Sequence, residues 1–275
     1  MFPSSLRLAG PAGLAAAVAA LAPAAVPSPA VAATATAVSS NWAGYAVTGK
    51  RYRRVTGSWT VTKGDCDGES DGYSATWIGL GGFDQGSQAL EQTGTELDCS
   101  ASGRASYSAW YELVPAASRT IRMKVRAGDR MAAAVSVSGT RVTMTLRNRT
   151  TGKSYRKVAR MSAPDVSSAE WIVEAPTGCD ADGRCSQLPL NDFGTVRFTG
   201  ASATTTAGHT GSISDTGWSA TAVELSQEAD RTVDGSVAAA LPSALAAGGS
   251  AFSVSYRDGT VSSARARRTL PSRVR

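Results

Sequence analysis

Histidine is almost absent from this sequence, with His209 the only one among 275 residues. It lies in the stretch TTAGHTGS, whose Gly and Thr content is typical of a solvated loop. Hydrolases with a Ser-His-Asp arrangement and metal sites built from several histidines both need histidine at the reacting centre. The sequence therefore argues against both classes, and we expect no metal ion and no other cofactor.

Cysteine is also scarce, and the four residues present are Cys66, Cys99, Cys179 and Cys185. An even number of cysteines suits a protein folded in an oxidising compartment. The segment between the last two, DADGR, has the composition of a turn, so we predict the disulfides Cys179–Cys185 and Cys66–Cys99. A zinc site is the alternative, but neither a CxxC spacing nor a histidine partner supports it.

Long hydrophobic runs are confined to the N-terminus. Residues 1–32 carry one charge, Arg7, followed by the run AGLAAAVAALAPAAV and by Ala30-Val31-Ala32, which fits the cleavage rule for signal peptides. The run falls short of the roughly 18 apolar residues of a membrane span. We therefore expect a signal peptide at 1–32 and a secreted, extracellular protein with no membrane association after its removal.

The net charge is +6, and much of the excess lies in residues 257–275, where six arginines face one acid, Asp258. Such a run is usually a solvated tail, and we expect this one to be disordered. Nucleic-acid binding is the alternative, which we do not expect of an exported protein. The predicted folded domain is residues 33–256, expected to be a monomer.

Alternation of apolar and polar residues is frequent, whereas helical periodicity is scarce. Ile121, Met123 and Val125 alternate with basic residues, and similar patterns follow at 141–150, 192–201 and 251–259, with Gly-containing turns between them. Many short strands at this spacing indicate an antiparallel β-sandwich or barrel. We expect one all-β domain with a single short helix around residues 236–247, interrupted by Pro242.

Two glutamates lie four positions apart in the strand-like stretch SSAEWIVEAP (167–176). In a strand, Glu170, Ile172 and Glu174 point to one face, and Trp171 and Val173 to the other. Glutamate is almost never buried without a partner, so the first face is expected to be polar or functional.

Two other segments have the same logic: LEQTGTEL (90–97) places Gln92 and Glu96 on one face, and AWYELVP (109–115) places Trp110 and Glu112 on one face. If these faces line the concave side of a curved sheet, they form a cleft with several carboxylates and one amide. The bland alternative is that they are ordinary solvent faces of edge strands.

Six motifs in order resemble the glutamic peptidases, or eqolisins, and the likeness runs from Asn41 to Tyr256. The motifs are SSNWAGYAV (39–47), ATWIGLGG (75–82), EQTG (91–94), AWYELVP (109–115), AEWIVE (169–174) and DFGTVRFTGA (192–201). The resemblance implies a lectin-like (concanavalin-like) β-sandwich of two curved antiparallel sheets. It also implies hydrolysis of peptide bonds in polypeptide substrates at acid pH by one Glu and one Gln, here in a secreted, bacterial-type member.

Carried over position by position, the resemblance places the catalytic pair on Gln92 and Glu170. We expect Glu170 to face Gln92 across one water in a solvent-open cleft, with its pKa raised by neighbouring carboxylates. The residues expected to line the cleft or bind substrate are Trp42, Trp77, Glu96, Trp110, Glu112 and Glu174. The sequence departs from the better-known pattern at Gly81, Glu96 and Val114, which leaves substrate preference open.

Two other functions are compatible with a secreted sandwich of this kind. A glycoside hydrolase needs two carboxyls about 5 Å apart when it retains configuration, whereas Glu170 and Glu174 would be roughly 13 Å apart along a strand. A binding module without catalysis could use Trp42, Trp77 and Trp110 to stack ligands, but it has no need of Gln92 paired with a glutamate.

Overall fold

The computed structural model describes residues 35–66, 70–180, 182–231 and 237–257. All of them belong to one compact unit, 32–275. The predicted signal peptide and the predicted Arg-rich tail lie outside the described residues, except that Arg257 ends the last strand. Within the described part of the chain, no helix is long and apolar enough to cross a membrane.

The described chain is built from strands, in agreement with the alternating sequence pattern. They are β1 (Ala35–Ser39), β2 (Trp42–Thr48), β3 (Tyr52–Thr60), β4 (Gly72–Gly81), β5 (Leu90–Cys99), β6 (Ala105–Val114), β7 (Ala116–Thr120), β8 (Arg130–Ser138), β9 (Arg141–Asn148), β10 (Ser154–Arg160), β11 (Ala169–Glu174), β12 (Thr177–Cys179), β13 (Cys185–Gln187), β14 (Thr195–Thr205), β15 (Thr210–Gly211), β16 (Ser219–Arg231), β17 (Val237–Pro242) and β18 (Phe252–Arg257).

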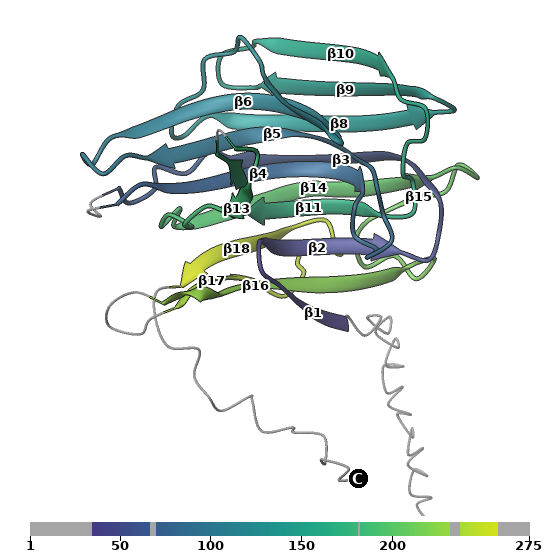
Figure 1. Ribbon diagram of the computed structural model, residues 1–275. Helices are drawn as coiled ribbons and strands as arrows, with labels where there is room; N and C mark the ends of the chain where they lie inside the picture. Colours follow the sequence, from purple (N-terminus) through teal and green to yellow (C-terminus); the bar gives the residue numbers. More distant parts are fainter. Residues whose placement is uncertain (1–34, 67–69, 181, 232–236, 258–275) are drawn as a thin grey trace, which may run out of the picture. The chain divides into compact units, whose positions relative to one another are not determined.

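One long sheet folds over to make two packed layers (Figure 1). The strand order is β10-β9-β8-β3-β14-β18-β17-β16-β2-β11-β4-β5-β6-β7, with antiparallel pairing along this path. Strands β3, β8 and β14 of one layer lie against β4, β5 and β11 of the other. The expected antiparallel β-sandwich is therefore confirmed.

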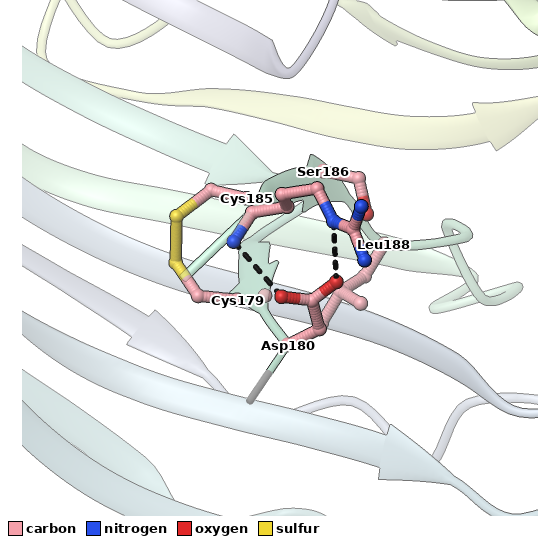
Figure 2. Close-up of a pocket in the computed structure, with 7 residues that line it drawn as sticks. Cys179, Asp180, Cys185, Ser186 and Leu188 are labelled. Atoms are coloured by element: carbon pink, nitrogen blue, oxygen red, sulfur yellow. Dashed lines mark hydrogen bonds and ion pairs between the residues drawn. A yellow bond between two sulfur atoms is a disulfide. The ribbon is translucent and has the colours of Figure 1, made fainter. Parts of the chain in front are cut away.

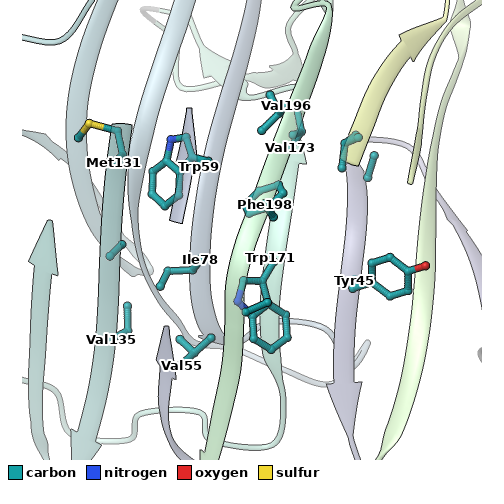
Figure 3. Packing of buried hydrophobic residues seen from close by; sticks show 14 of the residues in the cluster. Tyr45, Val55, Trp59, Ile78, Met131, Val135, Trp171, Val173, Val196 and Phe198 are labelled. Atoms are coloured by element: carbon teal, nitrogen blue, oxygen red, sulfur yellow. The ribbon is translucent and has the colours of Figure 1, made fainter. Parts of the chain in front are cut away.

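The core lies between the two layers and comes from the inward side of each alternating strand (Figure 3). Trp171 and Val173 are fully buried there, as predicted. The Trp171 indole N–H donates to the carbonyl of Thr56 in the opposite layer at 2.7 Å. A Cβ on Gly57 would lie 2.9 Å from the Trp171 ring, so this glycine lets the two layers approach closely.

The predicted short helix at 236–247 is wrong, because residues 237–242 form β17. The strand pairs with β16 through Leu225 and Ala240, and with β18 through Ala240 and Tyr256. Hydrogen bonding to a strand on each side outweighs the helix propensity of this alanine-rich stretch, because tertiary context overrides intrinsic propensity. Residues 121–125 lie outside the strands, yet Ile121, Met123 and Val125 are buried as their alternation indicated.

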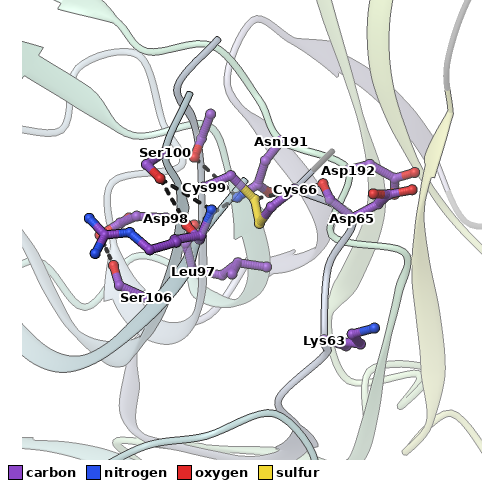
Figure 4. The surroundings of a disulfide bond; sticks show 12 residues. Lys63, Asp65, Cys66, Leu97, Asp98, Cys99, Ser100, Ser106, Asn191 and Asp192 are labelled. Carbon is purple, nitrogen blue, oxygen red and sulfur yellow. Dashed lines mark hydrogen bonds between the residues drawn. A yellow bond between two sulfur atoms is a disulfide. The ribbon is translucent and has the colours of Figure 1, made fainter. Parts of the chain in front are cut away.

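Both predicted disulfides are confirmed. Cys66–Cys99 joins the segment before β4 to the end of β5, the strand that carries Gln92 (Figure 4). Cys179–Cys185 closes the β12–β13 hairpin, in which Asp180 accepts hydrogen bonds from the backbone and side chain of Arg184 (Figure 2).

Candidate active site

Strands β11, β4, β5 and β6 are neighbours, and their register aligns the polar residues singled out in the sequence. Glu170 stands opposite Gly79 of β4, which stands opposite Gln92 of β5. Gln92 in turn stands opposite Glu112 of β6. Residues directly opposite each other in a sheet point to the same face. All these side chains therefore leave the sheet on the side away from the core.

A cavity of about 160 Å³ opens on this face. It gathers five of the predicted residues, from three strands. Its lining consists of Ala75, Gln92, Glu96, Trp110, Glu112, Ser118, Glu174, Pro176 and Thr177. The cavity therefore brings an amide together with three carboxyls, as expected for a cleft rather than for an ordinary solvent face.

Gln92 is 4% exposed, and its amide Nε2 donates to Oε2 of Glu112 at 2.6 Å. Its carbonyl Oε1 has no hydrogen-bond partner. One amide N–H is thus held by Glu112, the carbonyl is buried without a partner, and the second N–H is the group left to donate to a ligand. Glu112 fixes the direction in which the amide points.

Glu174 is held in place by two side-chain hydrogen-bond donors. Asn41 Nδ2 donates to its Oε1 at 3.0 Å, and the Trp77 indole N–H donates to its Oε2 at 2.8 Å. Burial raises the pKa of Glu174 to about 7, the nearby Trp42 indole and the Trp77 and Asn41 donors act to lower it, and the charge of Glu112 acts to raise it.

The other two carboxyls of the cavity are also difficult to ionise. Burial, reinforced by the charge of Asp98, raises the pKa of Glu96 to about 7 against the lowering effect of Ser108. Burial likewise raises the pKa of Glu112, against the hydrogen bond from Gln92. The cavity therefore retains protons well above the ordinary range of carboxyl groups, as suits chemistry in acid.

Two of the predicted cleft tryptophans, Trp42 and Trp77, are not among the residues that line the cavity. Trp42 and Trp77 meet edge to face, with ring centroids 5.0 Å apart. Trp77 belongs to a small apolar cluster on this face of the sheet with Leu90, Trp110 and Ile172, and Trp42 packs against this cluster. The cluster holds Trp77 in place, and Trp77 holds Glu174.

The predicted exposure of Glu170 is wrong. Its side chain is 0% exposed, neither carboxyl oxygen has a hydrogen-bond partner, and it is not part of the cavity lining. Burial raises its pKa well above the ordinary value, the nearby Ser168 hydroxyl acts to lower it without meeting hydrogen-bond geometry, and the charges of Asp165, Glu91 and Asp84 raise it further.

The segment before β11 explains this burial. The amide of Tyr52 donates to the carbonyl of Val166, and the amide of Gly81 donates to the carbonyl of Ser168, so the segment is tied to two other parts of the sandwich. Strand alternation predicts the same environment for Glu170 and Glu174. In the structure, the segment before β11 covers the end of the strand that carries Glu170, and this burial is not expected from alternation.

A second buried carboxyl, Glu91, lies close to Glu170. It is 0% exposed, and its Oε1 accepts the backbone N–H of Asp165 at 3.1 Å. Burial raises the pKa of Glu91 to about 8 against this hydrogen bond, and the charge of Asp165 raises it further. The interior thus contains two carboxyls whose burial favours the protonated form.

These two carboxyls predict a fold that is most stable in acid. Below about pH 4.5, Glu91 is protonated in both the folded and the unfolded chain. Between about pH 4.5 and its folded-state pKa of about 8, Glu91 is ionised in the unfolded chain but still protonated in the folded chain. The free energy of unfolding should therefore fall across this window, by about 5 kcal/mol for Glu91 alone.

Thermal unfolding followed by circular dichroism between pH 4 and pH 8 measures this effect. Glu91→Gln keeps an oxygen acceptor for Asp165 but cannot ionise, so its melting temperature should depend less on pH than that of the wild type. Glu224→Gln on β16 is the control and should follow the wild-type curve. Parallel curves for all three proteins would contradict the account.

Asn41 is the functional residue that the sequence argument did not single out. It belongs to the motif SSNWAGYAV, but only the neighbouring Trp42 was given a role. Its amide reaches Glu174 because Glu174 stands opposite Trp42 in the β11–β2 pair. The position of Asn41 directly before the predicted cleft residue Trp42 could have identified it as a site residue.

His209 is exposed, as expected, and its ring Nε2 lies 3.0 Å from an oxygen of Asp215. The pair is remote in sequence from the cavity residues and belongs to the turn between β14 and β15 and the segment that follows. Within the residues that the structure describes, no group of three or more His, Cys, Asp or Glu side chains could hold a metal ion.

Comparisons with known proteins identify the family of this chain. A model described as the Peptidase A4 family matches residues 40–263. Aspergillopepsin-2 of Aspergillus niger is 31% identical over 222 residues, which cover 72% of this chain and 74% of that protein.

Two solved structures resemble the sandwich over most of its length. Scytalido-glutamic peptidase with a peptide-based transition-state analogue has a TM-score of 0.64 at 27% identity, covering 79% of this chain and 98% of that one. Aspergilloglutamic peptidase from Aspergillus niger has a TM-score of 0.54 at 30% identity, covering 68% of this chain and 99% of that one.

Proposed function

This chain belongs to the Peptidase A4 family, the glutamic peptidases, and is an acid endopeptidase; we propose that Glu174 and Gln92 are its catalytic pair. The observation that carries the proposal is that these two side chains line one cavity, whereas Glu170 does not reach it. The catalytic carboxyl expected at Glu170 is therefore reassigned to Glu174, four residues along the same strand and on the same face.

Water is the nucleophile in this proposal, because the cavity has no His and no Cys. A peptide carbonyl enters between Glu174 and Gln92. Glu174 as a carboxylate accepts the proton of the attacking water, and the resulting carboxylic acid then gives that proton to the nitrogen of the leaving amine. The same group thus acts as base and then as acid.

Gln92 stabilises the oxygen on which negative charge develops. Its free N–H donates to the substrate carbonyl oxygen, and this hydrogen bond strengthens as the tetrahedral intermediate forms. Glu112 holds the other N–H at 2.6 Å, so the amide is oriented before substrate arrives. A neutral donor also leaves the proton affinity of Glu174 less disturbed than a cation would.

The raised pKa values of the cavity set its pH profile. Burial raises the pKa of Glu174 and of Glu96 to about 7 and raises that of Glu112, so in acid most of these carboxyls hold a proton, and the reactive form with Glu174 ionised is a minor fraction that carries one negative charge. As the pH rises towards about 7, the neighbouring carboxyls ionise as well and their charges repel that of Glu174. The alkaline limb of the pH profile therefore reflects loss of protons from the neighbours of Glu174.

Asn41→Ala tests how Glu174 is tuned. The Asn41 amide stabilises the carboxylate form, so removing it should raise the pKa of Glu174 and move the acid limb of kcat/KM to higher pH. The expected shift is about one unit, the size of one hydrogen bond to a charged group.

Gln88→Ala, which removes an exposed amide outside the cavity, is the matched control and should leave the limb in place. An unchanged acid limb in Asn41→Ala would show that the hydrogen bond does not govern the ionisation of Glu174.

Digestion of denatured casein at acid pH, with pepstatin present, tests the activity itself. Peptide release that pepstatin does not suppress is expected, because pepstatin is directed at paired aspartates and this cavity holds a Glu and a Gln. Absence of cleavage at every acid pH would overturn the proposed function.

Secretion completes the proposal. Two disulfides favour an oxidising compartment, and residues 1–32 have the composition of a signal peptide that leaves the domain 33–256 and its basic tail. We propose that the mature enzyme is an extracellular monomer, with no bound membrane or nucleic acid.

A further inference from the structure

Charge is divided unevenly between the two layers of the sandwich. Strands β3, β8, β9, β10, β14 and β18, which form one layer, contain no Asp and no Glu. The carboxyls of the active site all come from β5, β6 and β11 of the other layer. The basic residues of the acid-free strands are Arg53, Arg54, Arg130, Arg141, Arg147, Arg156, Lys157, Arg160, Arg197 and Arg257.

Most of these arginines share the outer face of their layer. Three of these arginines have a small residue opposite them on the neighbouring strand. The pairs are Arg54 with Ser136, Arg147 with Ala132, and Arg156 with Thr145. The inward alternates are the buried core residues of the same strands. We call this surface the arginine face; its exposed members are Arg54, Arg130, Arg141, Arg147, Arg156, Arg160 and Arg197.

The charges of the arginine face are not neutralised by the protein. In the described part of the chain, the salt bridges are those of Arg184 and His209, and none involves this face. Arg141 and Arg160 stand directly opposite each other on β9 and β10, an arrangement of like charges that destabilises a strand pair unless an anion lies nearby. The positive charges of this face would therefore be stabilised by a bound anion.

The face is also hollowed. A cavity of about 450 Å³ lies over β3, β8 and β9, with Thr56, Ser58 and Ala134 in its lining and Arg54, Arg147 and Arg149 around them. Small hydroxyl-bearing side chains let a chain-like ligand approach the sheet, and the guanidinium groups can then grip its oxyanions. Guanidinium groups match phosphate oxygens in a two-point geometry.

The working pH decides which anion suits this surface. Arginine stays charged in acid, whereas carboxylate polymers lose much of their charge near pH 4. A phosphodiester keeps its charge there. No aromatic side chain is among the residues that line the hollow, so nothing there offers the stacking platform that single-stranded nucleic acids use.

We propose that the arginine face binds a linear phosphodiester polymer without bases, of the polyol-phosphate kind. The active-site cavity opens on the outer face of the other layer, so a bound polymer would leave it free. The surface would anchor the peptidase to an anionic matrix while substrate enters from the opposite side.

The test is binding of fluorescently labelled poly(glycerol phosphate) to the full chain at about pH 4, measured by anisotropy across a salt series. The triple variant Arg54→Gln/Arg147→Gln/Arg156→Gln should lose at least about tenfold in affinity and about two units of the salt slope, from three lost phosphate contacts. The matched control, Arg104→Gln/Arg122→Gln/Lys124→Gln, removes the same charge elsewhere on exposed positions and should change affinity by less than about threefold.

Both variants should hydrolyse an uncharged peptide at the wild-type rate, which shows that the fold and the active site are intact. Equal losses in the two triple variants would mean that net charge alone drives binding and would overturn the proposal. Tighter binding of dextran sulfate, or of oligothymidylate, than of poly(glycerol phosphate) would overturn the assignment to a phosphodiester without bases.

Discussion

Glu174→Gln is expected to abolish peptide hydrolysis, with kcat lower by about 10³-fold or more. An amide at this position can neither accept the proton of the attacking water nor return it to the leaving amine. The change keeps the size of the side chain and an oxygen for one of its two donors, Asn41 and Trp77. The loss should therefore lie in kcat, with the melting temperature in acid nearly unchanged.

Steady-state kinetics on an internally quenched peptide, at the acid optimum, measure this loss. Glu224→Gln makes the same chemical change on β16, outside the cavity, and should retain full activity. A Glu174→Gln enzyme with more than a tenth of the wild-type kcat would remove this carboxyl from the mechanism.

Gln92→Ala should lower kcat by about 10² to 10³-fold, the effect of losing one donor to the developing oxyanion. The effect on KM should be smaller, because the hydrogen bond strengthens in the transition state. The variant also leaves Glu112 without the amide that lies 2.6 Å from its Oε2. The pKa of Glu112 should consequently rise, since a hydrogen bond that favours its ionised form is lost.

The Gln88→Ala variant again serves as the amide control. If Gln92→Ala raised KM and left kcat unchanged, Gln92 would bind substrate and transition state equally and would not favour the oxyanion. Such a result would mean that another donor of the cavity stabilises the oxyanion.

The sequence predicted the sandwich because its strands obey simple alternation. Trp171 and Val173 are buried where the period of two places them, and the turn-like DADGR segment closes a disulfide hairpin. The helix prediction at 236–247 failed because β17 pairs with both β16 and β18, the strands before and after it in the chain, and this pairing is not visible in the composition of the segment itself.

The sequence predicted most residues of the candidate site but not which glutamate is its catalytic carboxyl. Alternation correctly placed Gln92, Glu112 and Glu174 on one face, and all three line the cavity. It could not separate Glu174 from Glu170, since the two have the same phase. The difference comes from tertiary structure, because a segment tied down by Tyr52 and Gly81 shelters only one end of the strand.

The central claim is that Glu174, not Glu170, is the carboxyl that reacts. The most direct test is kcat for Glu170→Gln and Glu174→Gln, prepared together and assayed at acid pH on the same peptide. Because Glu170 is buried and holds its proton in the folded state, a neutral amide there should leave kcat within about threefold of the wild type, against a loss of about 10³-fold at Glu174. Loss of turnover in Glu170→Gln, with activity retained in Glu174→Gln and both proteins folded, would contradict the account.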